Sequence, residues 1–401
     1  MKFILWTLAV ILLSSCIHHT ENNHFSKKQI ESLKLDSTEI LNSNSDNITT
    51  IDLSPFLKKK SFGFGEMVDE INLVPLETNK KSYVNDIYNI IVTDSNIYIH
   101  DNFKGGGVII FDNEGKFIKR LSNGRGPGEI MRLFDIDFDK YKNELVIYQH
   151  SYLLFFSASG EYLRQEQLPI GFYNFTTTPD GYIFKTLDRQ NNHLGDLNNF
   201  TLLITDKNYK VKSTALPFPN MVGYGGYKYL YNNNSIYVTH KFTDTIYQYV
   251  NKTNQLKAEY VLNYNNKNLP NHISTSTLKE FENKARQNNY YFFIGRYLDT
   301  GNHHLFFLEN RYIRTLTVIY RDKKSGNMFG GTSANYNLNE IPPIAFPRWA
   351  YGNYLISAYL PSENDLFATH SNIISEKDKQ KVVDLTENDN PVLVFFKLKD
   401  F

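Results

Sequence analysis

The stretch that decides the fold begins with Asn96-Ile97-Tyr98-Ile99-His100-Asp101 and continues into a predicted hairpin. The first arm of the hairpin is Gly107-Val108-Ile109-Ile110-Phe111-Asp112, and the second is Lys116-Phe117-Ile118-Lys119-Arg120-Leu121. Between the arms lies Asn113-Glu114-Gly115, whose glycine takes a positive φ most easily. Because β-branched and aromatic residues dominate these segments, each is predicted to be a β-strand.

The same strand–turn–strand pattern returns along the chain. The starting strands of six such units lie near residues 97, 145, 182, 236, 305 and 354, and the successive gaps are 48, 37, 54, 69 and 49 residues. A repeat of about 50 residues with four strands is typical of a β-propeller. We therefore predict an all-β fold, a six-bladed propeller of four-stranded blades. A stack of two β-sandwiches is the alternative, but it does not require the pattern to return.

The two ends of the predicted propeller are expected to pair with each other. The segment Ile71-Asn72-Leu73-Val74-Pro75-Leu76 starts the repeat region, and Pro391-Val392-Leu393-Val394-Phe395-Phe396-Lys397-Leu398 ends the chain. Both read as strands without a partner nearby in sequence. Pairing them in one blade closes the ring and covers sheet edges that otherwise favour aggregation.

Composition excludes several classes of protein. Hydrophobic residues make up 41% and aromatic residues 15% of the 401 residues, which is enough for a large core and excludes wholesale disorder. The formal net charge of +1 gives no basic excess, so no nucleic-acid partner is expected. The single cysteine excludes an intrachain disulfide framework and a cysteine-rich metal site.

The N-terminus has the form of a bacterial lipoprotein signal. Lys2 precedes an apolar stretch over residues 3–13, which is too short to span a bilayer as a stable helix. The run Leu13-Ser14-Ser15-Cys16 matches a lipobox, in which the cysteine thiol takes the lipid and cleavage occurs before the cysteine. A plain secretory signal with an incidental cysteine is the alternative.

These patterns divide the chain into three parts. We predict a signal peptide over residues 1–15, a flexible polar tether over 16–50 that begins at the lipidated Cys16, and the propeller over 51–401. The membrane is then a partner through the lipid. Ile17, in place of an aspartate, favours the outer membrane, and the side that the domain faces stays open.

One helix is expected among the strands. The longest gap contains residues 276–286, which have helical composition, with Leu278, Phe281 and Ala285 at helical spacing after a serine cap. We expect a short helix over one face of the propeller, either as packing or as a lid over a ligand.

Two motifs resemble those of a known family. The segment Gly124-Arg125-Gly126-Pro127-Gly128-Glu129 and the closing Asn390-Pro391-Val392-Leu393 resemble motifs of six-bladed β-propeller lipoproteins of Bacteroidetes, relatives of the NHL/TolB-like propellers. The resemblance implies a fold and an envelope location, but no catalytic residue. In the glycine-rich segment, Glu129 is expected to hold a tight loop by accepting backbone N–H groups. Alternatively, Arg125 and Glu129 contact a ligand.

Candidate catalytic chemistry is sparse in the sequence. No HExxH or Gly-x-Ser-x-Gly motif is present. His100, His150 and His240 each lie near the end of a predicted starting strand, from which they could reach the channel as metal ligands or could simply be polar packing. Asp135, Asp137 and Asp139 alternate and could bind Ca²⁺, although solvated acids near a blade edge are the simpler interpretation.

Aromatic residues provide a last candidate surface. Two clusters, Tyr224-Gly225-Gly226-Tyr227-Lys228-Tyr229 and Asn289-Tyr290-Tyr291-Phe292-Phe293, could stack on a sugar or peptide or could fill the space between blades. The sequence favours a non-catalytic envelope module that binds a protein or a small ligand, with no required cofactor. The alternative is an envelope hydrolase or lyase with a metal, such as calcium, at the channel mouth.

Overall fold

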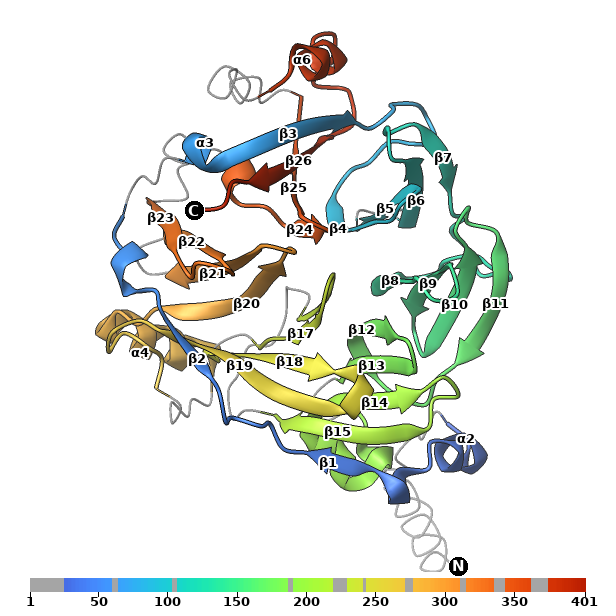
Figure 1. The fold of residues 1–401 in the computed structure, drawn as a ribbon. Coiled ribbons are helices and arrows are strands. Elements are labelled where there is room, and N and C mark those ends of the chain that lie inside the picture. The colour runs from blue at the N-terminus through green and yellow to red at the C-terminus, as the bar shows by residue number, and fades with distance from the viewer. Residues whose placement is uncertain are drawn as a thin grey trace, which may run out of the picture.

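In the computed structural model, the described residues are 25–59, 64–102, 107–186, 190–218, 229–240, 243–270, 277–310, 315–334, 343–361 and 374–401. They form six sheets that surround one central axis, as Figure 1 shows in a view down that axis. The prediction of an all-β, six-bladed propeller is therefore confirmed. Among the described helices, none combines the length and apolar character that a membrane crossing requires.

Each blade contains four antiparallel strands, ordered from the axis outward. Blade 1 contains β4 (Ile87–Val92), β5 (Asn96–Asp101), β6 (Gly107–Asp112) and β7 (Phe117–Arg120). Blade 2 contains β8 (Asp135–Asp139), β9 (Glu144–Gln149), β10 (Tyr152–Ser157) and β11 (Tyr162–Gln167). Blade 3 contains β12 (Phe172–Thr178), β13 (Gly181–Thr186), β14 (Phe200–Asp206) and β15 (Val211–Pro217). Blade 4 contains β16 (Leu230–Asn232), β17 (Ile236–Val238), β18 (Thr245–Val250) and β19 (Gln255–Asn263). Blade 5 contains β20 (Phe292–Asp299), β21 (His303–Asn310), β22 (Thr315–Asp322) and β23 (Met328–Ala334). Blade 6 contains β24 (Trp349–Tyr351), β25 (Tyr354–Tyr359), β26 (Val392–Leu398) and β3 (Val68–Pro75).

The recurring sequence pattern marks the second strand of each blade, not the first. The six predicted starting strands are β5, β9, β13, β17, β21 and β25, and each lies one position out from the axis. A second strand is covered on both faces by neighbouring blades, so it reads as a continuous apolar run. An innermost strand faces the channel and can be polar and short, as with the three residues of β16.

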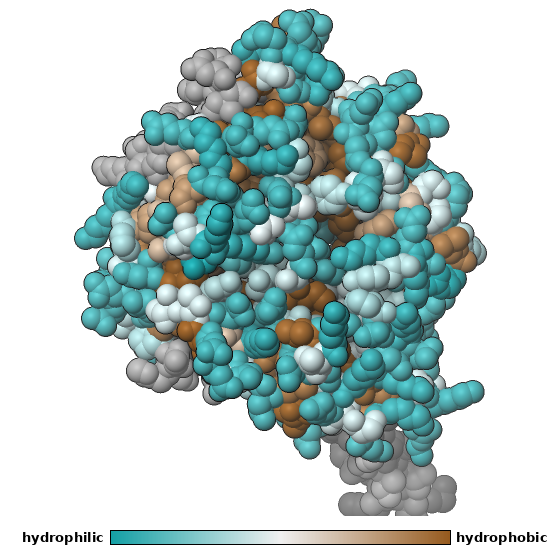
Figure 2. Space-filling model, viewed as in Figure 1, coloured by the Kyte–Doolittle hydropathy of each residue, from teal (hydrophilic) through white to brown (hydrophobic). Residues whose placement is uncertain are grey.

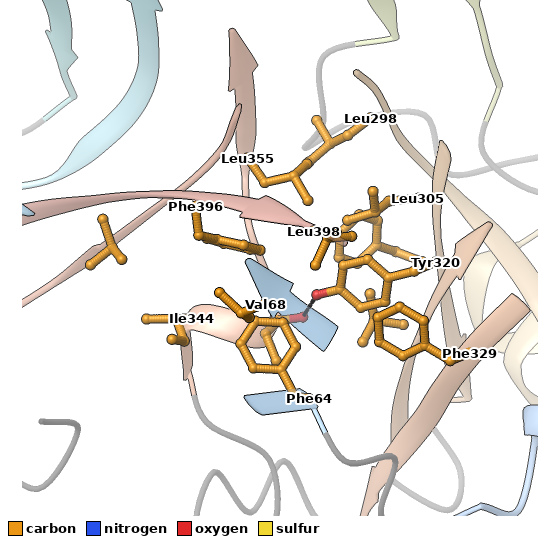
Figure 3. Packing of buried hydrophobic residues seen from close by; sticks show 14 of the residues in the cluster. Phe64, Val68, Leu298, Leu305, Tyr320, Phe329, Ile344, Leu355, Phe396 and Leu398 are labelled. Atoms are coloured by element: carbon orange, nitrogen blue, oxygen red, sulfur yellow. Dashed lines mark hydrogen bonds between the residues drawn. The ribbon is translucent and has the colours of Figure 1, made fainter. Parts of the chain in front are cut away.

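Ring closure follows the prediction. The strand β26 pairs antiparallel with β3, so that Phe396 lies opposite Ile71 and Val394 lies opposite Leu73. Blade 6 thus takes its outermost strand from the start of the domain and its third strand from the end of the chain. Figure 3 shows Phe396 and Leu398 of β26 packed with residues of blade 5, including Tyr320 and Phe329.

The segment before the propeller is partly structured, whereas we expected a flexible tether over 16–50. It contains α2 (Lys27–Ser32), η1 (Leu35–Ser37), β1 (Glu39–Leu41), β2 (Thr49–Asp52) and η2 (Ser54–Phe56). The strand β1 adds in parallel to the outer edge of blade 3, and β2 adds in parallel to that of blade 4. The Lys59 carbonyl then accepts a bond from the Thr332 amide of β23 (2.6 Å). We call residues 25–59 the strap, because they cross the outer edges of three successive blades (Figure 1).

The strap is held by apolar burial as well as by pairing. Leu33, Ile51, Leu53, Phe56 and Leu57 are buried, and Leu53 is 0% exposed. The last four belong to the core cluster between blades 4 and 5. Burial of several large side chains stabilises such a segment strongly, at about 1.5–3 kcal/mol for each.

Three α-helices and three further 3₁₀ turns complete the described structure. The predicted insertion helix is α4 (Leu278–Asn288), which is capped by the Thr277 hydroxyl and buries Phe281 and Ala285. The helix α6 (Glu376–Val382) packs beside β3, where the Lys381 ammonium donates to the Leu73 carbonyl (3.0 Å). The remaining elements are α3 (Phe64–Met67), η3 (Asn192–Asn199), η4 (Asn251–Thr253) and η5 (Pro343–Ala345).

Candidate functional site

A cavity of about 270 Å³ lies on the propeller axis. All six innermost strands contribute to its wall, so it is the central channel of the ring. Its residues are Tyr88, Asn89, Ile90, Ile91 and Val92 from β4, Asp135 and Asp137 from β8, Thr176 from β12, Leu230, Tyr231, Asn232 and Asn233 at β16, Arg296, Leu298 and Asp299 from β20, and Arg348, Trp349, Ala350 and Tyr351 at β24. The surface on the face seen in Figure 2 is mostly hydrophilic, with hydrophobic residues in small separate areas.

One end of the channel brings together an aromatic ring, an acid and an arginine. Tyr88, Asp135 and Arg348 lie at or just before the starts of their strands. Burial raises the pKa of Tyr88, the Asp135 charge raises it further, and the Arg348 charge opposes both. All three residues line the same cavity. The Arg348 guanidinium also lies 4.7 Å from the centre of the Trp349 ring, an arrangement that stabilises a cation.

The opposite end is formed where other strands finish. The Asn233 amide donates to the carbonyls of Asp299 (2.8 Å) and Gly352 (3.0 Å), which ties blade 4 to blades 5 and 6. The Gly352 amide donates back to Asn233 (3.0 Å). The Asp299 carboxylate turns outward from the axis to Lys323 (2.5 Å). These bonds fix the backbone around the channel. Arg296, from β20, is the second arginine among the residues that line the cavity.

Hydrogen bonds between neighbouring blades hold the middle of the channel. The Asp137 carboxylate accepts from the Thr177 amide (2.7 Å), the Thr177 hydroxyl (3.0 Å) and the Thr176 hydroxyl (3.1 Å). From the other side, the Asn232 amide donates to Thr176 (3.0 Å). Blades 2, 3 and 4 are therefore joined by polar groups at the axis, and such bonds preorganise the wall of a binding site.

Two of the three alternating acids, Asp135 and Asp137, belong to this wall, whereas Asp139 lies at the far end of the same strand beside another depression. The strand β8 carries Asp135, Asp137 and Asp139, of which Asp135 and Asp139 are buried. Asp135 accepts from the Phe175 amide (3.1 Å), which again links blade 2 to blade 3. The sequence therefore singled out a wall strand of the channel, but the expected place of the strand was wrong. No described geometry tests the calcium hypothesis.

The three predicted histidines do not come together. His100 is buried on β5, where its ring lies 4.8 Å from the Tyr88 ring, behind the channel wall. His150 is exposed in the turn after β9, beside Phe134. His240 is buried after β17, with its Nε2 2.8 Å from the Lys185 ammonium. In the described ranges, none of the three lines the channel cavity.

The pair of Lys185 and His240 is a buried feature that the sequence did not indicate. Burial lowers the pKa of both groups well below their usual values, and the Lys185 charge lowers that of His240 further. The Lys185 ammonium also donates to the Thr239 carbonyl (3.3 Å) and lies 5.8 Å from the Tyr229 ring. These contacts hold blades 3 and 4 together outside the channel.

The glycine-rich loop has the geometry of its structural interpretation. The Glu129 carboxylate accepts from the Gly126 amide (2.7 Å), while Arg125 is exposed. A Cβ added at Gly124 would lie 2.0 Å from that carboxylate. Gly128 has φ +75°, and a Cβ there would lie 2.7 Å from the Tyr162 ring of the next blade. The loop therefore needs these residues to make a tight connection between blades 1 and 2.

The remaining sequence candidates lie elsewhere. Of the residues 289–293, Tyr291, Phe292 and Phe293 are buried between blades, which is the packing interpretation. Residues 224–228 and Cys16 lie outside the described residues. Arg296 and Arg348 were missed because each stands alone in sequence, and only the ring brings them to one cavity.

These features define the class of protein as a six-bladed β-propeller with a charged and polar central channel. The chain belongs to the family described as a domain of unknown function, DUF4934, which matches residues 48–397. No curated protein matches the chain.

Solved structures support the fold. A Bacteroides fragilis protein, provisionally described as exported, is similar with a TM-score of 0.67 at 15% identity, covering 88% of this chain and 100% of its own. The extracellular domain of a two-component system of Bacteroides thetaiotaomicron has a TM-score of 0.36 at 12% identity, covering 66% of this chain and 30% of its own. The Pan2 WD40 domain of Neurospora crassa has a TM-score of 0.31 at 10% identity, covering 62% and 75%. Only the first supports an argument, and that argument concerns the fold alone.

Proposed function

We propose that this protein is a lipid-anchored propeller of the cell envelope that binds a small polar ligand in its central channel without catalysis. The observation that carries the proposal is the channel itself, a cavity to which all six blades contribute and whose wall contains acids, arginines, amides and aromatic rings. The wall also contains apolar side chains, such as Ile90, Leu230 and Leu298. Ligand sites typically combine an apolar lining with a few fixed polar groups.

The wall favours a ligand that offers both donors and acceptors. Arg296 and Arg348 suit a carboxylate or another planar anion, because a guanidinium donates two parallel hydrogen bonds to it. Asn89, Asp135 and Asp137 suit hydroxyl or amino groups. The cavity volume of about 270 Å³ lies just below the ~300–1,000 Å³ range of ligand pockets, so the ligand is small. Acidic sugars, amino acids and hydroxy acids meet these requirements.

A binding role is favoured over hydrolysis by what the wall acids do. The carboxylates of Asp135 and Asp137 accept backbone or hydroxyl donors from blade 3. Such contacts fix a site rather than leave an acid or base poised to react. A metal hydrolase or lyase with a channel-mouth centre, the alternative from the sequence, needs His and acidic groups that converge there.

The envelope location rests on the N-terminal pattern. Cys16 is the proposed lipid-attachment residue, and the chain from Cys16 to Phe25 spans nine residues, or at most ~30 Å. Since Phe25 contacts His193 of blade 3, the proposed anchor keeps this rim of the propeller within that distance of the membrane. This proposal includes a location at the outer membrane. It also includes a relationship to the NHL/TolB-like propeller lipoproteins of Bacteroidetes.

Calorimetric titration with a panel of monosaccharides, uronic acids, amino acids and hydroxy acids tests the ligand proposal. We expect one-site binding by the wild type, weakened about tenfold or more by Arg348→Ala and also weakened by Ala350→Phe, which adds bulk to a residue of the cavity wall. Arg286→Ala, on the outer helix α4, is the matched control and should bind as the wild type does. Binding that survives both channel variants would contradict the proposal, as would a failure of the whole panel.

Crosslinking in intact cells tests whether a protein partner is involved instead. Recovery of the propeller without a stoichiometric partner is the result that the proposal expects. A stoichiometric envelope protein whose capture is unaffected by Ala350→Phe would favour an interaction module that does not use the channel.

A further inference from the structure

A histidine and two aspartates meet where the chain ends. His303 is the first residue of β21 and Asp322 is the last residue of β22, and the two lie opposite each other in the ladder. Directly paired residues of antiparallel strands point to the same face of the sheet. Asp400 follows β26, so it approaches this pair from blade 6. Among the described residues, these three form the one group of His, Cys, Asp or Glu side chains that could bind the same metal ion.

The distances are close to those of a metal centre. The Nε2 atom of His303 lies 3.6 Å from the Oδ2 atom of Asp322, and one ligand atom from each of the three residues lies within 4.8 Å of the others. The same Nε2 atom donates a hydrogen bond to the Lys399 carbonyl (3.2 Å), a bond that a bound metal ion would replace. Atoms that share one zinc ion lie about 3–3.5 Å apart, because each bond is about 2.0–2.2 Å long. The Asp400 side chain is exposed, so its carboxylate can rotate to shorten the remaining distance.

The two buried ligands are already oriented. The Oδ1 atom of Asp322 accepts from the amides of Lys324 (2.8 Å) and Ser325 (2.7 Å), so Oδ2 is left facing His303. The His303 ring stacks on the Phe401 ring, with centres 5.3 Å apart and planes 11° apart. Metal sites typically hold their ligands by such outer contacts.

Three of the nearby lysines, Lys323, Lys397 and Lys399, are engaged with other groups. The Lys323 ammonium bonds to Asp299 (2.5 Å) and to the Thr300 carbonyl (2.6 Å). The Lys399 ammonium donates to the Glu66 carbonyl (2.9 Å), and that of Lys397 pairs with Glu70 (2.9 Å). The negative charge of Asp322 and Asp400 is therefore available to a cation, and both residues line surface depressions that solvent enters.

We propose that His303, Asp322 and Asp400 bind a divalent transition-metal ion of the zinc type. An imidazole with carboxylates suits Zn²⁺, Co²⁺ or Ni²⁺, whereas Ca²⁺ prefers an all-oxygen site. The ion clasps the end of the chain in blade 6 to the β21–β22 pair of blade 5, next to the strands that close the ring. This site is separate from the proposed channel site, and the proposal does not depend on whether the channel binds a ligand.

Titration of the chelator-treated full-length protein with Co²⁺ and Zn²⁺ tests the site. We expect one equivalent to bind, with a visible Co²⁺ absorption band that Zn²⁺ removes, and a higher Tm with metal. Asp400→Asn removes a ligand at an exposed position and should weaken binding about tenfold or more, since even loss of outer contacts costs about 10–100-fold. His303→Asn should do the same, and the exposed Asp384→Asn is the matched control.

Two results overturn the proposal. One is the absence of stoichiometric Co²⁺ or Zn²⁺ binding by the wild type, including the case in which only Ca²⁺ binds. The other is Asp400→Asn protein that binds Co²⁺ with the wild-type affinity and spectrum. Since Asp400 is exposed, this variant is expected to fold even if His303→Asn does not.

Discussion

Replacement of Asn390 by aspartate is the sharpest test of how the ring is closed. Asn390 belongs to the closing motif and is 1% exposed. Its side-chain oxygen accepts from the Val84 amide (2.8 Å), and its side-chain nitrogen donates to the carbonyls of Glu77 (2.8 Å) and Ser82 (3.0 Å). One side chain therefore satisfies three backbone groups of the connection between β3 and β4, which leads from blade 6 into blade 1.

The expected loss follows from these three bonds. Asn390→Asp has nearly the same shape, but it loses both donated bonds and places a charge beside two carbonyl oxygens. Each buried group left without a partner costs about 1–3 kcal/mol, so we expect a loss of about 3 kcal/mol or more in the free energy of unfolding. Asn390→Ala removes all three bonds and should cost a similar amount, with a small cavity in addition.

Urea unfolding, followed by fluorescence and circular dichroism, measures the effect. Asn388→Asp is the matched control, because Asn388 lies two residues before Asn390 and is exposed. We expect its midpoint to lie near that of the wild type. If the midpoint of Asn390→Asp equals that of the control, the three bonds of Asn390 do not stabilise the closed ring, and the reasoning is refuted.

Three further predictions concern the strap, a buried histidine and the anchor. Leu53→Ala should lower the free energy of unfolding by about 2–5 kcal/mol, since Leu53 is 0% exposed, while Ile40→Ala, at 54% exposure, should change it little; urea midpoints that fall equally would contradict an integral strap. Burial lowers the pKa of His304 from 6.5 to about 4. As the pH falls from 6.5 to 4, this histidine is therefore protonated in the unfolded state but stays neutral in the folded state. Stability should therefore decline over that window by about 3 kcal/mol in total, and His304→Gln should flatten the profile of unfolding midpoint against pH; an unchanged slope would count against this assignment. Cys16→Ala should abolish labelling by a lipid probe and release the protein from membranes, whereas continued labelling would exclude this anchor.

Much of the architecture was predictable because it depends on local burial. The second strand of each blade is covered on both faces, so its apolar run stands out in sequence. The closing strands β3 and β26 were also recognisable, since both are apolar and neither has a partner nearby. The helix α4 followed from helical spacing and a capping hydroxyl.

The innermost strands and the strap were not predictable for physical reasons. A strand that faces a polar channel has no apolar alternation, and β16 and β24 contain only three residues each. The strap strands β1 and β2 lie among asparagines and serines, and they pair with edges that are far away in sequence. The sequence of residues 39–52 itself does not indicate which edges these strands pair with. The polar composition of this segment was therefore interpreted as a tether.

The candidate sites depend on the same long-range information. Arg296 and Arg348 line one cavity with Asp137 only because the ring brings blades 2, 5 and 6 to one axis. His303 and Asp400 are almost a hundred residues apart and meet only through ring closure. The acids of β8 were noticed as a pattern, but the place of Asp135 and Asp137 in the channel wall required the order of strands within the blade.

The central claim is that the channel binds a small polar ligand, and a crystal structure of the protein with the tightest compound of the titration panel tests it most directly. We expect the compound on the propeller axis, with its anionic or planar polar group against Arg348 or Arg296. A compound bound with full occupancy on an outer surface, with the channel unchanged, would contradict the claim.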